Sequence, residues 1–298
     1  MPEQRINLGL IGWPLDHSLS PRIHQAALQE LGLAGRYCLY AIEPNHIQDV
    51  AILDLLEHVA AGEIDGLNVT LPYKQTVVPL LAALTPSAEC IGAVNTIYME
   101  NGLLTGDNTD AAGFQNDLQQ LPVEKHTPAL LLGAGGAARA VLFSLLKAGY
   151  SVGVAARNLL QAQELAHSFN AIANTPVEVL PLEKNALSQI SRKIGLLVNA
   201  TPLGMSPDTE TCPWPEDLAL PLHACVYDLV YNPVDTLLVR RACQAGLPAR
   251  SGLGMLVEQA ALAFERWTGY TAPRAVMRQA VQDACEPRIR QTSQRKIK

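Results

Sequence analysis

The stretch Ala129-Leu130-Leu131-Leu132-Gly133-Ala134-Gly135-Gly136-Ala137-Ala138 decides the fold. Its four leading apolar residues are typical of a buried strand, and residues 137–148 are expected to form the helix that follows. The intervening glycines have the G-x-G-x-x-A spacing, which lets the backbone approach a pyrophosphate while the helix N-terminus donates N–H groups to it. This unit predicts an α/β fold with a dinucleotide-binding domain. The alternative is a tight strand–helix turn that binds no ligand.

The residues after this unit continue the alternation of strands and helices. Strands are predicted at 151–155, 177–180, 196–199 and 226–231, and helices at about 159–169 and 236–245. Arg157 follows the first of these strands, at the position where an NAD-binding domain usually carries Asp or Glu. Because an arginine suits a 2′-phosphate, NADP is preferred over NAD.

In the first half of the chain, a lysine follows a short predicted strand. Gly66-Leu67-Asn68-Val69-Thr70 is rich in strand-forming residues, and Pro72 cannot continue a sheet ladder. Lys74 therefore sits at the carboxyl end of a strand, where ligands bind in open α/β sheets. A lysine in a dry cleft can act as an acid or base because burial shifts its pKa readily. The alternative is a solvated surface lysine, and only the neighbouring motifs argue against it.

Further polar residues stand beside predicted helix starts. Ser18 and Ser20 follow a strand predicted at 6–11, and Ser20 is expected to be the N-cap of a helix that runs from about Pro21 to Leu31. Asp110 precedes a helix predicted at about 111–121, and it is interpreted either as an N-cap or as a site residue. Met255 and Gln259 lie four residues apart, so they share one face of a helix predicted at 255–268.

The remaining predicted elements complete the first half and the end of the chain. Asn101-Gly102 is a strong turn signal and predicts a hairpin of strands at 93–98 and 103–106. A further strand is expected at 37–41, and helices are expected at about 44–60 and 273–284. The basic residues after 284 have no apolar period and are expected to be solvated.

Length and composition exclude several classes of protein. A chain of 298 residues is about twice the commonest domain length, so two domains or one large domain are expected. Hydrophobic residues make up 48% and charged residues 17%, which is too apolar for a disordered chain. The net charge of −6 argues against nucleic acid as the main partner. No apolar run approaches the roughly 20 residues of a membrane span, and no signal peptide is evident, so a cytoplasmic protein is expected.

The six cysteines show no C-x-x-C pair and no close histidine spacing. They are interpreted as reduced packing thiols, and no metal site is predicted.

From Ile6 to Ala284 the sequence resembles the shikimate dehydrogenase family. The motifs that carry the resemblance are Gly12-x-Pro14-x-x-His17-Ser18-x-Ser20-Pro21, Asn68-Val69-Thr70-x-Pro72-x-Lys74, Gly92-Ala93-Val94-Asn95-Thr96, Gly106-x-Asn108-Thr109-Asp110, Gly133-x-Gly135-Gly136-Ala137, Asn199-Ala200-Thr201 and Met255-Leu256-x-x-Gln259. Several separate motifs in the right order are very improbable by chance.

The resemblance implies two α/β domains with the active site in the cleft between them. A substrate-binding catalytic domain would cover 1–110, a Rossmann-type NADP-binding domain 111–250, and C-terminal helices over 251–298 would return to the first domain. The implied reaction is the reversible NADPH-linked reduction of 3-dehydroshikimate to shikimate in aromatic amino acid biosynthesis. A homodimer is compatible with the resemblance, which does not decide the oligomeric state.

The resemblance also implies residue roles. Lys74 would be the acid/base and would pair with Asp110. The implied substrate-binding residues are Ser18, Ser20, Thr70, Asn95, Asp110, Tyr231 and Gln259. The implied cofactor-binding residues are Gly133, Ala134, Gly135, Gly136, Ala137, Arg157, Leu229, Gly252 and Met255. No metal is implied.

One departure from the family concerns the cofactor. The family often has Asn-Arg-Thr after the second cofactor strand and a further basic residue three or four positions on. Here the residues are Ala156-Arg157-Asn158, and Gln161 stands where the second base could be. The preference for NADP over NAD therefore rests on one arginine.

Two other functions stay open. A quinate/shikimate dehydrogenase with relaxed cofactor use is the first, although Ser18 and Ser20 favour shikimate, because a larger or missing side chain there would be expected to make room for quinate. A non-catalytic dinucleotide-binding sensor is the second, although it would have no reason to carry Lys74, Asp110 and Gln259 together.

Overall fold

The computed structural model describes residues 5–44 and 48–285. The chain forms two compact units, unit 1 from residues 1–109 with 257–298, and unit 2 from residues 110–256. The chain passes from unit 1 to unit 2 at the start of α4 (Thr109–Leu118) and returns within α9 (Leu253–Thr268). The basic tail after 285 and residues 45–47 of the helix predicted at 44–60 lie outside the described residues.

Unit 1 is built on a mixed six-stranded sheet in the order β2-β1-β3-β5-β6-β4. Its strands are β1 (Ile6–Gly12), β2 (Gly35–Ala41), β3 (Gly66–Val69), β4 (Ala83–Leu84), β5 (Thr96–Glu100) and β6 (Leu103–Asp107). β1 runs parallel to β2 and β3, whereas β5 is antiparallel to both β3 and β6. The carboxyl ends of β1, β3 and β6 therefore meet the amino end of β5 at one edge of the sheet.

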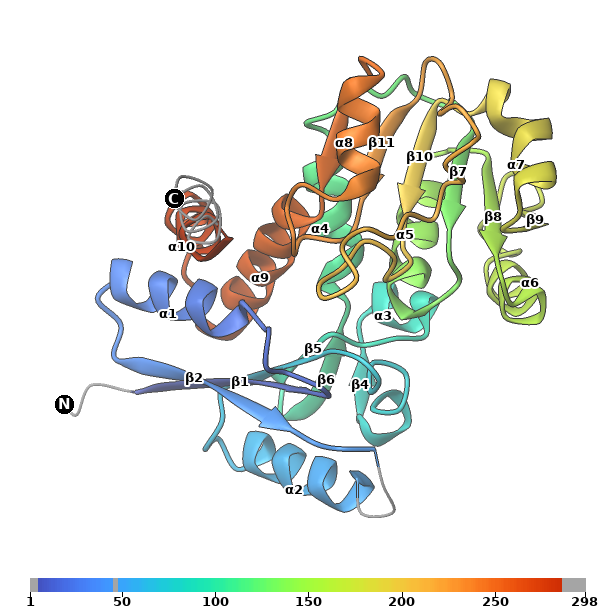
Figure 1. Cartoon of the computed structure of the whole chain (residues 1–298). Coiled ribbons are helices and arrows are strands. Elements are labelled where there is room, and N and C mark those ends of the chain that lie inside the picture. Colours follow the sequence, from blue (N-terminus) through green and yellow to red (C-terminus); the bar gives the residue numbers. More distant parts are fainter. Residues whose placement is uncertain (1–4, 45–47, 286–298) are drawn as a thin grey trace, which may run out of the picture. The chain divides into compact units, whose positions relative to one another are not determined.

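Helices cover both faces of this sheet. The helices of unit 1 besides α9 are α1 (Ser20–Glu30), α2 (Gln48–Ala60), α3 (Pro86–Ile91) and α10 (Arg274–Cys285), with a 3₁₀ turn at Val78–Leu80. Figure 1 shows α2 on one face, and α1, α9 and α10 on the other. Ile52 and Leu56 of α2 pack against Leu67 in one apolar cluster. The predicted hairpin is confirmed, since Asn101 and Gly102 both have positive φ between β5 and β6.

Unit 2 contains a six-stranded sheet in the order β12-β11-β10-β7-β8-β9. Its strands are β7 (Ala129–Leu132), β8 (Val152–Ala156), β9 (Glu178–Pro181), β10 (Leu196–Asn199), β11 (Cys225–Asp228) and β12 (Ala249–Ser251). Every neighbouring pair is parallel, so all six carboxyl ends lie at one edge. This arrangement confirms the predicted α/β fold with a Rossmann-type unit.

Helices pack on both faces of the unit 2 sheet. They are α4, α5 (Gly136–Lys147), α6 (Leu159–Ser168), α7 (Lys184–Ile190) and α8 (Leu237–Gln244), with a 3₁₀ turn at Ser191–Lys193. The strands are apolar on both sides, as parallel strands between two helix layers must be. Leu131 packs in one cluster with residues of α4, α5 and α6, whereas Leu130 packs in another with residues of α7 and α8.

The predicted N-cap at Ser20 is wrong, and so is the N-cap alternative for Asp110. α1 begins at Ser20, so Leu19 takes the N-cap position, and the Ser18 Oγ accepts a hydrogen bond from the Ser20 N–H at 3.3 Å. α4 begins at Thr109, so Asp110 lies in the first turn and is not an N-cap. The N–H of Thr109 is instead bound by the Asn95 Oδ1 at 2.8 Å, a partner that local spacing cannot reveal.

Among the described residues, no helix combines the length and the apolar composition that crossing a membrane would require.

Candidate active site

The predicted substrate residues of unit 1 gather at one edge of its sheet. Ser18 and Ser20 follow β1, and Thr70 and Lys74 follow β3. Asn95 directly precedes β5, whose amino end lies at the same edge. The strand order thus brings together residues that are far apart in the sequence.

The turn after β3 holds Lys74 beside the start of β5. Tyr73 is 1% exposed, and its hydroxyl donates to the Ile42 carbonyl at 2.7 Å, which fixes the turn. The carbonyl of Lys74 accepts from the Val94 N–H, also at 2.7 Å. The Lys74 side chain is partly buried. Lys74 therefore lies at the carboxyl end of β3, as the sequence predicted. In open α/β sheets, ligands bind at this edge.

Asn95 links several of the predicted residues. Its Nδ2 donates to the Thr109 Oγ1 at 2.9 Å and to the Gln259 Oε1 at 3.5 Å. Its Oδ1 accepts from the Thr96 hydroxyl at 3.0 Å. α9 therefore brings Gln259 to Asn95 across more than half of the chain. Asp110, which follows Thr109 directly, is 6% exposed.

A buried polar chain connects Ser20 to the Asn95 group. The Ser20 side chain hydrogen-bonds the Tyr37 hydroxyl, which donates to the Asn68 Oδ1 at 2.8 Å. The Asn68 Nδ2 donates in turn to the Asn95 carbonyl at 3.0 Å. Burial raises the pKa of Tyr37, so its hydroxyl keeps its proton. Tyr37 has no predicted role, because no local pattern in the sequence shows which side chains it contacts.

The glycine turn of unit 2 is shaped for close backbone approach. Gly133 has φ +103, and a Cβ built there would lie 3.0 Å from the Thr201 side chain. Gly135 is the N-cap of α5 and offers no side chain to the first turn of the helix. A Cβ built at Gly135 meets nothing within 4 Å, so this side of the turn is open. These features fit the pyrophosphate of a dinucleotide.

The other predicted cofactor residues follow neighbouring strands of the same sheet. Arg157 is exposed after β8, and Asn158 caps α6 by accepting from the Gln161 N–H at 3.2 Å. Gly252 follows β12, and a Cβ built there would come within 2.1 Å of the Leu229 carbonyl oxygen, so only glycine permits this contact. All of these positions lie at the carboxyl edge of the unit 2 sheet.

The two units divide the predicted residues as follows. Unit 1 carries Ser18, Ser20, Thr70, Lys74, Asn95 and Gln259, and unit 2 carries Asp110, Gly133, Ala134, Gly135, Gly136, Ala137, Arg157, Leu229, Tyr231, Gly252 and Met255.

Asp228 is a residue whose connections sequence reasoning missed. It is fully buried at the end of β11 and accepts from the Asn199 Nδ2 at 2.8 Å, the Thr236 hydroxyl at 2.7 Å and the Val230 N–H at 3.0 Å. Burial raises the pKa of Asp228 to about 6, and these hydrogen bonds act in the opposite direction. The sequence showed polar residues at both strand ends, but it could not show that they bind one another.

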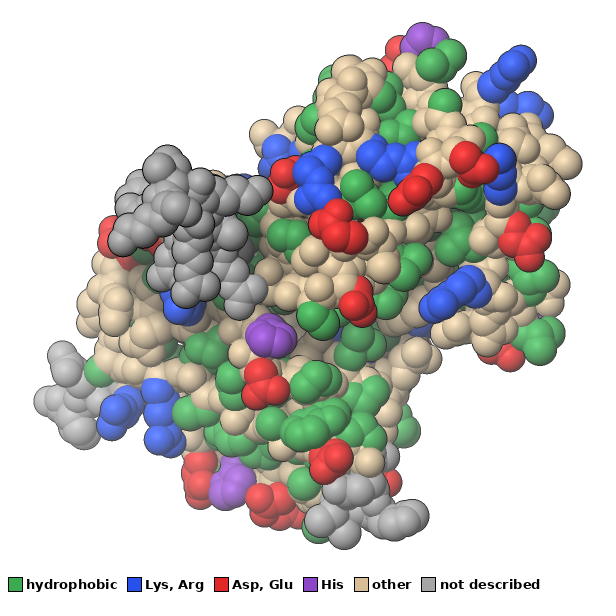
Figure 2. All heavy atoms as spheres, in the orientation of Figure 1, with side chains coloured by type: hydrophobic (Ala, Val, Ile, Leu, Met, Phe, Trp, Pro, Cys, Tyr) green, Lys and Arg blue, Asp and Glu red, His purple; other side chains and the backbone are tan. Residues whose placement is uncertain are grey.

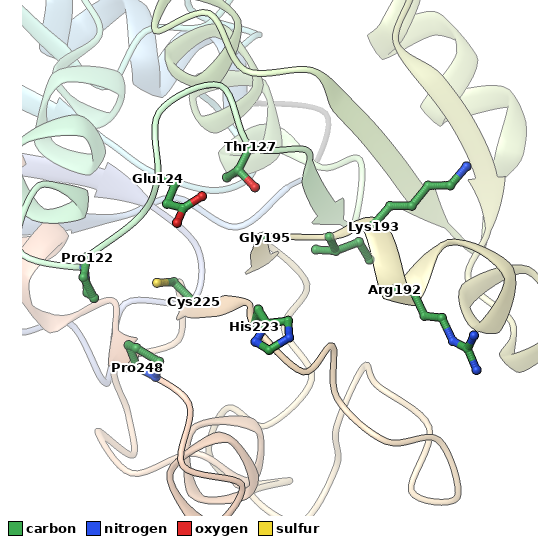
Figure 3. Close-up of a pocket in the computed structure, with 10 residues that line it drawn as sticks. Pro122, Glu124, Thr127, Arg192, Lys193, Gly195, His223, Cys225 and Pro248 are labelled. Atoms are coloured by element: carbon green, nitrogen blue, oxygen red, sulfur yellow. The ribbon is translucent and has the colours of Figure 1, made fainter.

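A cavity of about 270 Å³ lies at the opposite edge of the unit 2 sheet. Its lining includes Gly195, Cys225 and Pro248, which stand at or just before the amino ends of their strands. Figure 3 shows the side chains of Arg192 and Lys193 extending away from the other labelled side chains. Ligands of parallel α/β sheets bind at the carboxyl edge, so this cavity is not the candidate site.

On the face drawn in Figure 2, the basic side chains (blue) and acidic side chains (red) are interspersed, and they form no continuous basic patch. An anionic ligand would therefore be held by local donors, such as Arg157 and the first turn of α5.

Comparisons with known proteins agree with the motifs. Residues 10–97 match the shikimate dehydrogenase substrate binding domain, and residues 252–282 match the shikimate 5'-dehydrogenase C-terminal domain. A curated relative, the shikimate dehydrogenase (NADP(+)) of Desulforamulus reducens, is 41% identical over 276 residues, which cover 91% of this chain and 92% of the relative.

Two solved structures are similar over almost the whole chain. The shikimate 5-dehydrogenase of Thermus thermophilus in complex with NADP(H) and shikimate has a TM-score of 0.82 and 38% identity, with 94% of this chain and 99% of that chain covered. The quinate dehydrogenase of Corynebacterium glutamicum in complex with NAD has a TM-score of 0.85 and 31% identity, with the same coverage of 94% and 99%. With these similarities added to the motifs, the chain belongs to the shikimate dehydrogenase family.

Proposed function

We propose that this chain catalyses the reversible NADPH-linked reduction of 3-dehydroshikimate to shikimate, a step of aromatic amino acid biosynthesis. The observation that carries the proposal is the gathering of Lys74, Asn95 and Gln259 at one sheet edge of unit 1. These side chains offer hydrogen bonds in several directions, which suits a small polyhydroxylated acid and would suit an acyl chain poorly.

NADP is the proposed cofactor, and the fit rests on unit 2. The open turn at Gly133 to Ala137 would hold the pyrophosphate, and Arg157 would meet the 2′-phosphate. Leu229, Gly252 and Met255 would line the nicotinamide site. Bound there, NADPH would supply the hydride that reduces the substrate carbonyl.

Lys74 is the proposed acid and base. Negative charge grows on the carbonyl oxygen during reduction, so an ammonium placed at that oxygen both stabilises the charge and delivers the proton. Asp110 would pair with the lysine and orient it. In the reverse direction Lys74 would accept the proton of the shikimate hydroxyl.

The remaining residues would bind the substrate before and during the reaction. Ser18 and Ser20, with Tyr231, would hold the carboxylate. The ring hydroxyls would be bound by Thr70, Asn95, Asp110 and Gln259.

The direct test is the absorbance of NADPH formed when the purified chain is mixed with NADP and shikimate. The proposal predicts NADPH formation that requires both reagents. If no shikimate-dependent NADPH appeared, the chain would instead be classed as a non-catalytic dinucleotide-binding protein of the family.

Quinate oxidation is the second candidate activity. It is favoured by the similarity to the Corynebacterium glutamicum quinate dehydrogenase, which is 31% identical and was solved with NAD. Initial rates with each acid and each cofactor decide between them. We expect the highest kcat/KM for shikimate with NADP, and a higher value for quinate with NAD would assign the chain to the second activity.

Ser18→Ala should raise the KM for shikimate by roughly 10- to 100-fold, with kcat little changed. A hydrogen bond to the carboxylate is present in both the bound substrate and the transition state, so its loss weakens both equally. Ser188→Ala, at an exposed position of α7, is the matched control and should leave both constants unchanged. A fall in kcat with an unchanged KM would contradict the carboxylate role.

Arg157→Ala should raise the KM for NADP by roughly 10- to 100-fold and leave the KM for NAD unchanged, because only NADP carries the 2′-phosphate. Arg192→Ala is the control, since Arg192 is exposed beside the cavity at the other edge of the sheet. An equal effect on both cofactors would remove Arg157 from phosphate recognition.

We further propose that the protein is cytoplasmic and that it assembles as a homodimer. Light scattering of the purified chain measures its mass, and the mass of a single chain would contradict the dimer.

A further inference from the structure

A buried carboxylate stands where the two helices that connect the units come together inside unit 2. Asp117, near the C-terminal end of α4, is 1% exposed. The Tyr227 hydroxyl donates to its Oδ2 at 2.8 Å, and the Arg250 Nη2 donates to its Oδ1 at 2.6 Å. A buried carboxylate is costly unless its oxygens are satisfied, so this arrangement resists displacement.

The same group holds the first turn of α9. A Cβ built at Gly254 would lie 1.9 Å from the Asp117 Oδ1, so the absence of a side chain at this position lets the carboxylate rest against the turn. The Met255 N–H hydrogen-bonds the Tyr227 hydroxyl. This satisfies one of the N–H groups that every helix start leaves without a partner in the helix.

Tyr227 is itself fixed from β11. Its ring is fully buried and packs edge-on against Phe114 of α4, with ring centroids 5.0 Å apart. Burial raises the pKa of Tyr227, so the hydroxyl remains a donor to Asp117. The hydroxyl thus has one fixed acceptor and one fixed donor.

We propose that Tyr227 and Asp117 are positioning residues that fix the first turn of α9 and thereby place Met255 against the nicotinamide. The inference rests on the proposed function, because it takes the nicotinamide contact of Met255 from there. Neither residue is assigned a contact with substrate or cofactor, so both act through the backbone of 254–255.

Tyr227→Phe tests the proposal because it removes the hydroxyl and keeps the ring on Phe114. We expect kcat for shikimate oxidation to fall about 2- to 10-fold, with the KM for shikimate changed by less than about twofold. The primary isotope effect, measured with shikimate deuterated at the carbon that is oxidised, should rise, because a misplaced nicotinamide slows hydride transfer itself.

Tyr98→Phe is the matched control. Tyr98 is 4% exposed, and within residues 5–44 and 48–285 its hydroxyl has no hydrogen-bond partner, so its removal should change neither kcat nor the isotope effect. A lower kcat for Tyr227→Phe with an unchanged isotope effect would indicate a smaller folded fraction and would overturn the proposal. Should Tyr227→Phe not fold, Arg250→Gln removes one partner of Asp117 and should shift the isotope effect in the same direction.

Hydrogen exchange separates this inference from the proposed function. The amide of Met255 should exchange faster in Tyr227→Phe than in Tyr98→Phe, whether or not the wild type oxidises shikimate. Equal exchange of the Met255 amide in the two variants would refute only the positioning role of Tyr227. An inactive wild type would refute only the proposed function.

Discussion

Lys74→Ala is expected to lower kcat for shikimate oxidation by roughly 10²- to 10⁴-fold, while the KM for shikimate stays nearly unchanged. The ammonium matters most when charge develops on the reacting oxygen, so its removal affects the transition state far more than the bound substrate. Initial rates in both directions measure the effect. A small primary amine added to the assay should restore part of the rate, because it can occupy the space left by the side chain.

Lys193→Ala is the control for this change, because Lys193 is exposed at the opposite edge of the unit 2 sheet. It should leave kcat unchanged. If Lys74→Ala also kept the wild-type kcat, the lysine would have no part in proton transfer.

His24→Phe is expected to remove the part of the acid-induced loss of stability that comes from protonating His24. His24 on α1 is fully buried, and its ring stacks on Tyr37 with centroids 4.4 Å apart. Among the described residues, neither ring nitrogen has a hydrogen-bond partner at bonding distance. Burial lowers the pKa of His24 from 6.5 to about 3, with Asn68 acting in the opposite direction.

The sign of the effect follows from proton binding. Between pH 6.5 and about 3 the unfolded chain protonates His24 and the folded chain does not, so the free energy of unfolding falls as the pH falls. At pH about 4.5 this amounts to about 3 kcal/mol, at 1.36 kcal/mol for each pKa unit. Relative to the wild type, His24→Phe should therefore gain stability by about that amount between pH about 7 and about 4.5.

Urea denaturation followed by tryptophan fluorescence at the two pH values measures this difference. Asp228 has the opposite effect on the free energy of unfolding. Because its pKa is raised to about 6 in the folded chain, it stabilises the fold in acid, and this contribution is lost as the pH rises from 3.8 through 6. Comparing variant with wild type cancels this contribution. Phe169→Leu, at a buried ring paired with Phe143 in unit 2, changes no titratable group, so its effect should be the same at both pH values. A difference that did not change with pH would show that the folded chain protonates His24 as readily as the unfolded chain does.

Local patterns predicted most of the fold, because strands and glycine turns are determined by a few consecutive residues. The strand at Ala129–Leu132 and the turn at Gly133 were found where the sequence indicated them. The short helix α3 was missed, although Thr85 caps it and a proline opens it. Ser20 was predicted to be an N-cap because its spacing from Pro21 favours that role, but Leu19 takes the position. For Asp110 the spacing left an N-cap and a site residue open, and the Asn95 side chain binds the first N–H of α4 instead.

The long-range polar contacts could not be predicted. Asp107 accepts from Thr85 at 2.6 Å and pairs with Arg266 at 3.2 Å, and these partners lie on both sides of it in the sequence at large separations. Asp117 and Asp228 are similar cases. A buried carboxylate in a sequence shows only that partners must exist, and the fold decides which residues they are. The sheet edge at which Lys74 and Asn95 lie could be predicted, because the ends of strands can be predicted from the sequence.

The proposed mechanism depends most on Lys74 and Asp110 acting together as a catalytic pair. A double-mutant cycle in kcat/KM for shikimate tests this directly. Lys74→Ala, Asp110→Asn and the double variant are compared with the wild type under saturating NADP. The double variant should be about as slow as Lys74→Ala alone, because a carboxylate that orients a lysine has nothing to orient once the lysine is gone. A double variant whose loss equals the product of the two single losses would show that the residues act independently and would contradict the proposed mechanism.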